Sequence, residues 1–293
     1  MMQKRTLTQK QLIFNQMKKQ DWQIVITDLD GTLLNNRQEI SFEDMKSLYW
    51  LGENNVIRVI ATGRNFFSLS KVLKSNFPID YLVFSSGAGI YDWKNKTLLH
   101  SEYLPDIEVT QISKILINHN VDFMIHEVIP ENHKFLFHRS GNHNTDFEKR
   151  IWLYKDFAVE MDKAIDKHTH ACQIIAVFPN DISLFDEISR KFQDIKIIRT
   201  TSPIDGESIW MEIFPNTVSK GHGIDWLCKH LKINPLNSIS IGNDYNDIDM
   251  LEYTAKQFVV ANAPDDLKEK FPVCKSNMES GFTDALSMFF DFF

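Results

Sequence analysis

The sequence has few cysteines, no concentrated block of like charge and no long apolar run. Its three cysteines, Cys172, Cys228 and Cys274, are isolated and without C-x-x-C spacing, which excludes a disulfide framework or a cysteine zinc site. Lys and Arg number 32 against 39 Asp and Glu, so the net charge is −7. Nucleic-acid and anionic-membrane surfaces need a basic patch, and a membrane helix needs about 20 apolar residues. We therefore predict no nucleic-acid or membrane partner.

The composition is that of a folded, soluble chain. The 293 residues are 43% hydrophobic and 24% charged, and their number indicates two domains. Residues 1–20 are basic and lack the apolar stretch of a secretory signal, so they are expected to form an N-terminal extension of a cytoplasmic protein. Leu12, Ile13 and Met17 could form one helical stripe, which leaves both a docking helix and a frayed tail open.

From residue 21 onward, short apolar runs alternate with amphipathic segments. The expected strands are 24–26, 56–60, 81–84, 209–214, 238–241 and 258–261. The expected helices are 42–51, 67–73, 221–231 and 247–253. Strands separated by helices form right-handed βαβ units around a parallel sheet covered on both faces. The pattern predicts an α/β protein with a doubly wound parallel-sheet core.

Parallel sheets carry their chemistry at the carboxyl ends of strands, and residues 28–32 (DLDGT) follow the first expected strand. Asp28 and Asp30 project to the same side of an extended chain, so their repulsion calls for a cation or a shared proton. A hard divalent ion such as Mg²⁺ fits this oxygen pair. A turn with solvated acids would explain an isolated D-x-D-G equally well. A calcium EF-hand is excluded, although Glu39 stands at its twelfth position, because Gly31 is at the fourth position rather than the sixth.

Two further clusters indicate phosphate binding. Residues 62–64 (TGR) offer a hydroxyl and backbone N–H groups at a strand-to-helix turn, although Thr62 could simply cap the helix. Lys220 stands at a helix start, where its charge opposes the helix dipole and so indicates an anionic partner.

A fourth polar cluster, residues 242–249 (GNDYNDID), follows the strand at 238–241. It contains Asp244, Asp247 and Asp249 together with Asn243 and Asn246. A capped helix with acids in its first turn accounts for some of these residues. Metal ligation is predicted for at least one.

Together the four clusters resemble the motifs of the haloacid dehalogenase-like phosphatases, and most closely their Cof-like sugar-phosphatase branch. Residues 212–221, 261–263 (ANA) and 276–277 (SN) with Gly281 also resemble that branch. The resemblance covers residues 22–90 and 205–286, whereas the middle of the chain matches only in general pattern. It implies a Mg²⁺-dependent phosphoric monoester hydrolase that acts through an aspartyl phosphate.

The resemblance also implies a role for each matching residue. Asp28 would attack phosphorus, and Asp30 would protonate the leaving oxygen and later activate water. The implied phosphate-binding residues are Thr62, Gly63, Lys220 and Asn246. The implied metal ligands are Asp28, Asp30 through its carbonyl, Asn243 and Asp247.

The sequence departs from the family pattern at two positions. Asn243 stands where the family has a metal-binding aspartate; an amide oxygen can ligate Mg²⁺ but brings no charge, and Asp244 could take the role instead. Ser86 stands where the family usually has asparagine, which is expected to change local hydrogen bonding only.

The spacing of the motifs locates a second domain. Between Thr62 and Lys220 lie far more residues than one crossover needs, so we expect an inserted α+β cap at 86–200, between core segments 21–85 and 201–293. The resemblance implies that such a cap selects the substrate. His138 and Arg139, in the polar loop 138–143, are the candidate specificity residues, although a solvated hairpin loop explains this stretch equally well.

Three functions remain open at this point. The first is a phosphatase acting on a small phosphate ester, most simply a sugar phosphate. The second is a phosphomutase, which would use the same nucleophile and return the phosphoryl group to substrate. The third is a non-catalytic phosphate-binding module, against which the presence of both Asp28 and Asp30 argues. The sequence does not indicate the particular substrate or the oligomeric state.

Overall fold

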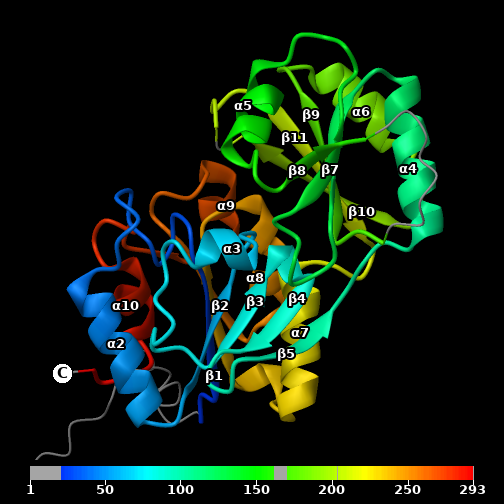
Figure 1. The fold of residues 1–293 in the computed structure, drawn as a ribbon. Helices are drawn as coiled ribbons and strands as arrows, with labels where there is room; N and C mark the ends of the chain where they lie inside the picture. The colour runs from blue at the N-terminus through cyan, green and yellow to red at the C-terminus, as the bar shows by residue number, and fades with distance from the viewer. Residues whose placement is uncertain (1–20, 162–169, 203, 293) are drawn as a thin grey trace, which may run out of the picture. The chain divides into compact units, whose positions relative to one another are not determined.

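The computed structural model describes residues 21–161, 170–202 and 204–292, which divide into two compact units (Figure 1). The first unit holds the described residues up to Gly63, residues 72–98 and the chain from Ser219 onward. The second unit holds residues 64–71 and 99–218. The expected stripe of Leu12, Ile13 and Met17 lies outside the described residues.

The first unit is built on an eight-stranded sheet of order β14-β13-β12-β1-β2-β3-β4-β5. Its strands are β1 (Ile24–Asp28), β2 (Ile57–Ala61), β3 (Tyr81–Phe84), β4 (Gly89–Asp92), β5 (Thr97–Ser101), β12 (Ser238–Gly242), β13 (Lys256–Val260) and β14 (Val273–Cys274). The strands from β14 to β3 pair in parallel, whereas β4 is antiparallel to β3. All residues of β1 and β12 are buried, as expected for central strands covered on both faces.

Helices cover both faces of this sheet. They are α2 (Phe42–Glu53), α7 (Lys220–Leu231), α8 (Ile248–Tyr253), α9 (Asp265–Lys270) and α10 (Gly281–Leu286), with the 3-10 turns η1 (Ser85–Gly87), η2 (Pro235–Asn237) and η3 (Tyr245–Asp247). The connections β1–α2–β2 and β12–α8–β13 run in opposite directions along the sheet, so right-handed crossovers put α2 and α8 on opposite faces (Figure 1). Gly221 lets α7 approach α8, because a Cβ there would lie 2.6 Å from the main-chain oxygen of Asp249.

The strand order brings three strand ends together. β1 lies between β12 and β2, with Thr27 opposite Ile241 and Asp28 opposite Ala61. The residues that follow these strands therefore share one edge of the sheet, where parallel sheets carry their binding sites.

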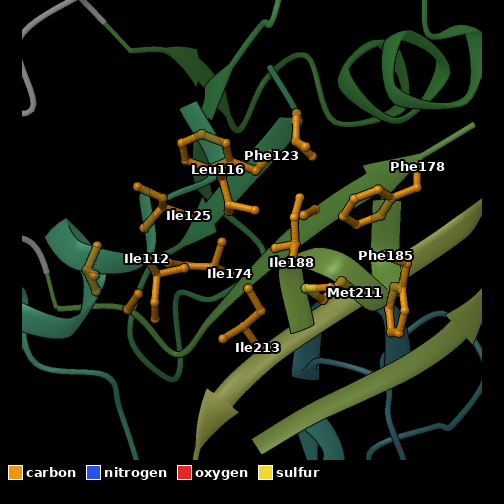
Figure 2. Packing of buried hydrophobic residues seen from close by; sticks show 14 of the residues in the cluster. Ile112, Leu116, Phe123, Ile125, Ile174, Phe178, Phe185, Ile188, Met211 and Ile213 are labelled. Atoms are coloured by element: carbon orange, nitrogen blue, oxygen red, sulfur yellow. The ribbon is translucent and has the colours of Figure 1, made fainter. Parts of the chain in front are cut away.

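The second unit contains a six-stranded sheet of order β10-β11-β9-β6-β7-β8. Its strands are β6 (Asp122–His126), β7 (Phe135–His138), β8 (Ala158–Glu160), β9 (Gln173–Phe178), β10 (Ile195–Thr201) and β11 (Ile209–Pro215), and its helices are α3 (Phe66–Leu69), α4 (Asp106–Asn118), α5 (Thr145–Leu153) and α6 (Ile182–Ser189). Apolar side chains from α4 and α6 pack against those of β6, β9 and β11 (Figure 2). Ile112, Phe123 and Met211, each at most 2% exposed, are in this core.

The α/β fold class predicted from the sequence is confirmed. The boundaries of the insertion differ from the expected 86–200. At its start, β4 and β5 extend the larger sheet past residue 85. At its end, the strand expected at 209–214 is β11, which pairs antiparallel with β9 and β10 in the smaller sheet. The apolar run of this strand would fit either sheet, so only its pairing partners decide its place. The helix expected at 67–73 is the shorter α3, after which turns bury Leu73.

Candidate active site

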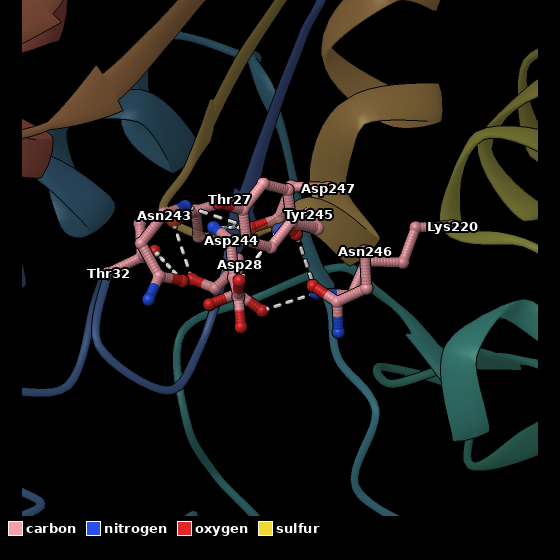
Figure 3. Close-up of polar contacts among 9 residues, drawn as sticks. All are labelled: Thr27, Asp28, Thr32, Lys220, Asn243, Asp244, Tyr245, Asn246 and Asp247. Atoms are coloured by element: carbon pink, nitrogen blue, oxygen red, sulfur yellow. Dashed lines mark hydrogen bonds and ion pairs between the residues drawn. The ribbon is translucent and has the colours of Figure 1, made fainter. Parts of the chain in front are cut away.

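A buried lysine joins carboxylates from two strand ends of the first unit (Figure 3). Lys220 is the first residue of α7, whose N-cap is the Ser219 hydroxyl. Its Nζ lies 2.6 Å from Asp28 Oδ1 and 2.6 Å from Asp247 Oδ1. It also donates to Asn246 Oδ1 at 3.4 Å. Four of the residues named from the sequence therefore meet around one ammonium group.

Burial governs the charges of this cluster. Removal from water raises the pKa of Asp28 to about 7, an effect that Lys220 opposes and Asp247 reinforces. Burial alone would lower the pKa of Lys220, but the carboxylates of Asp247 and Asp28 raise it above its ordinary value. The lysine thus stays charged and favours the ionised, nucleophilic form of Asp28.

Asp247 is completely engaged within this cluster. Its Oδ1 accepts from Lys220, and its Oδ2 accepts from the backbone N–H groups of Asn243 at 2.8 Å and Asp244 at 3.0 Å. The sequence singled out Asp247 as a metal ligand, whereas here it holds the lysine and the loop 243–247. Asp244 is exposed and its Oδ1 accepts from the N–H of Tyr245 at 2.7 Å, so it caps η3.

The side-chain amide of Asn243 faces Asp28. One of its terminal atoms lies 3.1 Å from Asp28 Oδ2, 3.1 Å from the main-chain oxygen of Asp30 and 3.1 Å from the Thr32 hydroxyl. With nitrogen at this position, the amide donates to all three oxygens. With oxygen there, it forms an oxygen cluster with Asp28 and Asp30 whose mutual repulsion a cation would offset.

This oxygen set fits a magnesium ion. Mg²⁺ takes carboxylate, carbonyl and amide oxygens and keeps several waters. Asp28 supplies a carboxylate oxygen and Asp30 a carbonyl oxygen, each 3.1 Å from the terminal amide atom of Asn243, which supplies the amide oxygen. Among the described residues, no three His, Cys, Asp or Glu side chains are placed to hold a metal. A metal here would therefore depend on the backbone carbonyl and on the amide.

The proposed phosphate-binding turn lies at the end of β2. Thr62 is buried; its N–H donates to the carbonyl of Val83 at 2.9 Å, and its carbonyl accepts from the N–H of Ser86 at 3.0 Å. A Cβ on Gly63 would lie 3.5 Å from the hydroxyl of Ser86. Val83 of β3 and Ser86 of η1, the position that departs from the family pattern, thus support this turn.

Sequence reasoning did not foresee the backbone conformation of η1. Ser85 and Ser86 have φ of 50° and 57°, in the left-handed region that serine rarely adopts, and Gly87 follows at 106°. A Cβ on Gly87 would lie 2.1 Å from the carbonyl oxygen of Ser219, which precedes Lys220. This strained turn therefore packs between the Thr62 turn and the start of α7. The Ser86-Gly87 pair directly after a strand was its available signal.

The specificity candidates lie in the second unit. The guanidinium of Arg139 is held by Glu148 at 2.7 Å and 3.1 Å and by Glu160 at 2.8 Å. The ring of His138 lies against Phe123 with centroids 5.2 Å apart. The cluster around Lys220 belongs to the first unit. Among the described residues, no helix has the length and apolarity to cross a membrane.

Comparison with known proteins gives consistent matches. The family model of haloacid dehalogenase-like hydrolases matches residues 25–286. A 5-amino-6-(5-phospho-D-ribitylamino)uracil phosphatase of Bacillus subtilis is 27% identical over 286 residues, covering 89% of this chain and 97% of that protein.

Solved structures share the fold. A phosphatase of the same superfamily from Bacteroides thetaiotaomicron has a TM-score of 0.75 at 16% identity, covering 91% of this chain and 94% of that one. A subclass IIB sugar phosphatase has a TM-score of 0.71 at 20% identity, covering 91% and 98% of the two chains.

Proposed function

The chain belongs to the haloacid dehalogenase-like hydrolases, and we propose that it hydrolyses a small phosphorylated metabolite through an aspartyl phosphate formed on Asp28. As a member of this family with relatives named phosphatases, it is a phosphoric monoester hydrolase. The predicted resemblance to the Cof-like branch is likewise confirmed. The observation that carries the proposal is the buried Asp28–Lys220 pair, in which an ammonium 2.6 Å away favours the ionised form of a carboxyl at a strand end.

The reaction proceeds in two displacements. A carboxylate oxygen of Asp28 attacks phosphorus and forms the acyl phosphate, while the ester P–O bond breaks and Asp30 gives its proton to the leaving oxygen. A water molecule then gives a proton to Asp30 and attacks phosphorus, which breaks the bond to Asp28 and releases inorganic phosphate. Two displacements with a positioned acid and base replace one slow hydrolysis. Asp30 suits this role because it is exposed one turn beyond the buried nucleophile.

The remaining site residues bind the phosphoryl oxygens. We assign this to the Thr62 hydroxyl, the N–H of Gly63 and the ammonium of Lys220, with Asn246 orienting the lysine through its 3.4 Å contact. Lys220 neutralises both the phosphoryl group and Asp28, whose like charges would otherwise keep them apart.

Mg²⁺ is the proposed cofactor. The ion would be held by Asp28, the carbonyl of Asp30 and the amide oxygen of Asn243. Asp244 is the alternative to Asn243. Asp247 remains a candidate ligand, but it would first have to leave its present contacts. A bound Mg²⁺ supplies positive charge that offsets the repulsion between the substrate phosphate and the carboxylates.

The proposed substrate class is a phosphorylated sugar or sugar alcohol. One structural neighbour is named a sugar phosphatase, and a sequence relative is named for a substrate that carries a phosphoribityl group. We further propose that His138 and Arg139 contribute to the choice of substrate. Arg139→Ala should then raise KM for the best sugar phosphate and preserve kcat, as for a contact made equally in ground and transition states. An unchanged KM would assign Arg139 to its ion pairs with Glu148 and Glu160.

Phosphate release from a panel of sugar phosphates, nucleotides, pyridoxal phosphate and flavin mononucleotide, with and without Mg²⁺, tests the proposal. Asp28→Asn should abolish turnover of every substrate without loss of fold. Asp265→Asn is the matched control, because Asp265 is an exposed carboxylate paired with Lys268 at 2.7 Å and should leave the rate unchanged. Activity of Asp28→Asn near that of the wild type would refute the covalent mechanism. Turnover that requires a bisphosphate activator would indicate a phosphomutase, and phosphate binding without turnover a binding module.

A further inference from the structure

Two asparagines from the C-terminal part of the chain contact the loop that follows the nucleophile. Asn262, after β13, donates from Nδ2 to the carbonyl of Gly31 at 2.9 Å. Asn277, after β14, donates from Nδ2 to the carbonyl of Leu34 at 3.0 Å and to Asn36 Oδ1 at 3.2 Å. The partners are separated by 231, 243 and 241 positions in the chain, so these contacts exist only in the folded first unit.

The two asparagines are also joined to each other. The backbone N–H of Asn277 donates to Asn262 Oδ1 at 3.0 Å. Both ends of the Asn262 amide are therefore engaged, which fixes its orientation. Asn277 is only 3% exposed, so its side chain is held by packing as well as by hydrogen bonds. Asn277 and its bond to Leu34 are buried, whereas Asn262 and its bond to Gly31 are exposed, so hydrogen bonds at both ends of its amide hold Asn262.

The loop they hold carries the proposed acid–base group. Asp30 directly precedes Gly31, whose φ of 78° lies in the left-handed region and whose carbonyl is the one Asn262 binds. The loop closes through the N–H of Leu34, which donates to the carbonyl of Leu29 at 2.8 Å. The nucleophile needs no such support, because Asp28 belongs to β1 and its neighbours pair with strands on both sides.

We propose that Asn262 and Asn277 are positioning residues that aim Asp30, and not Asp28, at the reacting oxygen. The inference rests on the proposed function, since it concerns the step in which Asp30 protonates the leaving oxygen. Without the bond from Asn262, the peptide plane after Gly31 can rotate and the carboxyl of Asp30 loses its direction. Asp28 and Lys220 keep their contact, because neither residue belongs to the loop that Asn262 holds.

Leaving-group dependence tests this assignment. A good aryl leaving group, as in 4-nitrophenyl phosphate, needs little help from a general acid, whereas a sugar alkoxide needs much. A general acid contributes roughly 10²–10⁴-fold, so partial misorientation in Asn262→Ala should lower kcat/KM about tenfold for the best sugar phosphate and less than about threefold for the aryl ester. Asn262→Asp keeps the acceptor for Asn277 but loses the donor to Gly31, so it should show the same selective loss.

Asn54→Ala is the matched control. Asn54 also donates from Nδ2 to a backbone carbonyl, that of Trp50 at 2.9 Å, but it lies before β2, at the opposite edge of the sheet. This variant should leave kcat/KM unchanged for both substrates. Equal losses for both substrates in Asn262→Ala, or no loss for either, would overturn the positioning role and leave a purely structural one.

A second measurement is independent of turnover. Hydrogen exchange of the amides in residues 29–36 should quicken in Asn262→Ala and not in Asn54→Ala, and unchanged exchange would overturn the inference. If the wild-type protein released no phosphate from any ester, the proposed function would fail, while hydrogen exchange would still decide whether the asparagines hold the loop.

Discussion

Replacing Asn243 by aspartate should make the stability of the first unit depend on magnesium. In the metal-free protein the wild-type amide can point its nitrogen at Asp28 Oδ2, Asp30 O and the Thr32 hydroxyl, each 3.1 Å away. A carboxylate cannot donate to these oxygens. Asn243→Asp therefore replaces an attractive contact with a repulsive one.

The distance sets the magnitude. Two unit charges 3.1 Å apart repel by about 5 kcal/mol at an effective dielectric constant near 20. Because the pKa of Asp28 is already about 7, its protonation at pH 7 relieves most of this repulsion, and the lost hydrogen bonds of the amide remain as the main cost. We expect Asn243→Asp to lower the unfolding free energy of the first unit by about 1–3 kcal/mol in EDTA. Saturating Mg²⁺ should reverse the order and make the variant more stable than wild type, because a charged ligand binds the ion more tightly.

Urea unfolding in EDTA and in Mg²⁺, read by hydrogen exchange of peptides covering β1 and β12, measures both effects. Asn54→Asp is the matched control: it makes the same chemical change at the exposed C-cap of α2 and should lower stability by less than about 1 kcal/mol, with no response to Mg²⁺. A variant as stable as the wild type in EDTA would refute the placement of the amide. A variant destabilised in EDTA but unaffected by Mg²⁺ would show that residue 243 is not the ligand.

Three further outcomes are expected. Asp244→Ala should leave the Mg²⁺ dependence of activity nearly unchanged, because Asp244 caps η3; a weakening larger than that of Asn243→Ala, in a magnesium titration, would make Asp244 the ligand. Ser86→Asn should raise the melting temperature, with a gain of up to about 1 kcal/mol, because asparagine tolerates the left-handed conformation better than serine; a lower melting temperature would contradict this. Burial, with Arg150 and His133 nearby, lowers the pKa of His126 to about 3, so the unfolded chain takes up a proton below pH 6.5 that the folded one refuses. The contribution of His126 to stability should fall by about 2 kcal/mol from pH 7 to pH 5, and the urea midpoint of His126→Asn should lack this part of the pH dependence.

The sequence predicted the composition of the site because its signals are local. A buried parallel strand reads as an apolar run, and the polar residues at its end are adjacent to it in the chain. Asp28, Thr62 and Asn243 could therefore be named without knowing the strand order. Their place at one edge of the sheet follows once β1 lies between β2 and β12.

The structural features that the sequence did not predict depend on contacts between residues far apart in the chain. The run of β11 is as apolar as a core strand, and only its antiparallel partners β9 and β10 assign it to the second unit. The sequence placed Arg139 in a polar loop but did not predict its ion pairs, because the carboxylates of Glu148 and Glu160 belong to other elements. The left-handed backbone of Ser86 has only the neighbouring Gly87 as a signal, since serine adopts this conformation against its own preference.

The charges around Lys220 explain how an uncharged residue can stand at position 243. Asp28 and Asp247 already place two carboxylates on one buried ammonium, and burial raises the pKa of Asp28 to about 7. A third carboxylate 3.1 Å from Asp28 would raise that pKa further and favour the protonated form, which cannot attack phosphorus. The Asn243 amide instead satisfies the oxygens of Asp28 and Asp30 in the absence of metal and can turn its oxygen toward an incoming cation. We therefore expect a nucleophile that is more fully ionised, and a site that binds Mg²⁺ more weakly, than with aspartate at this position.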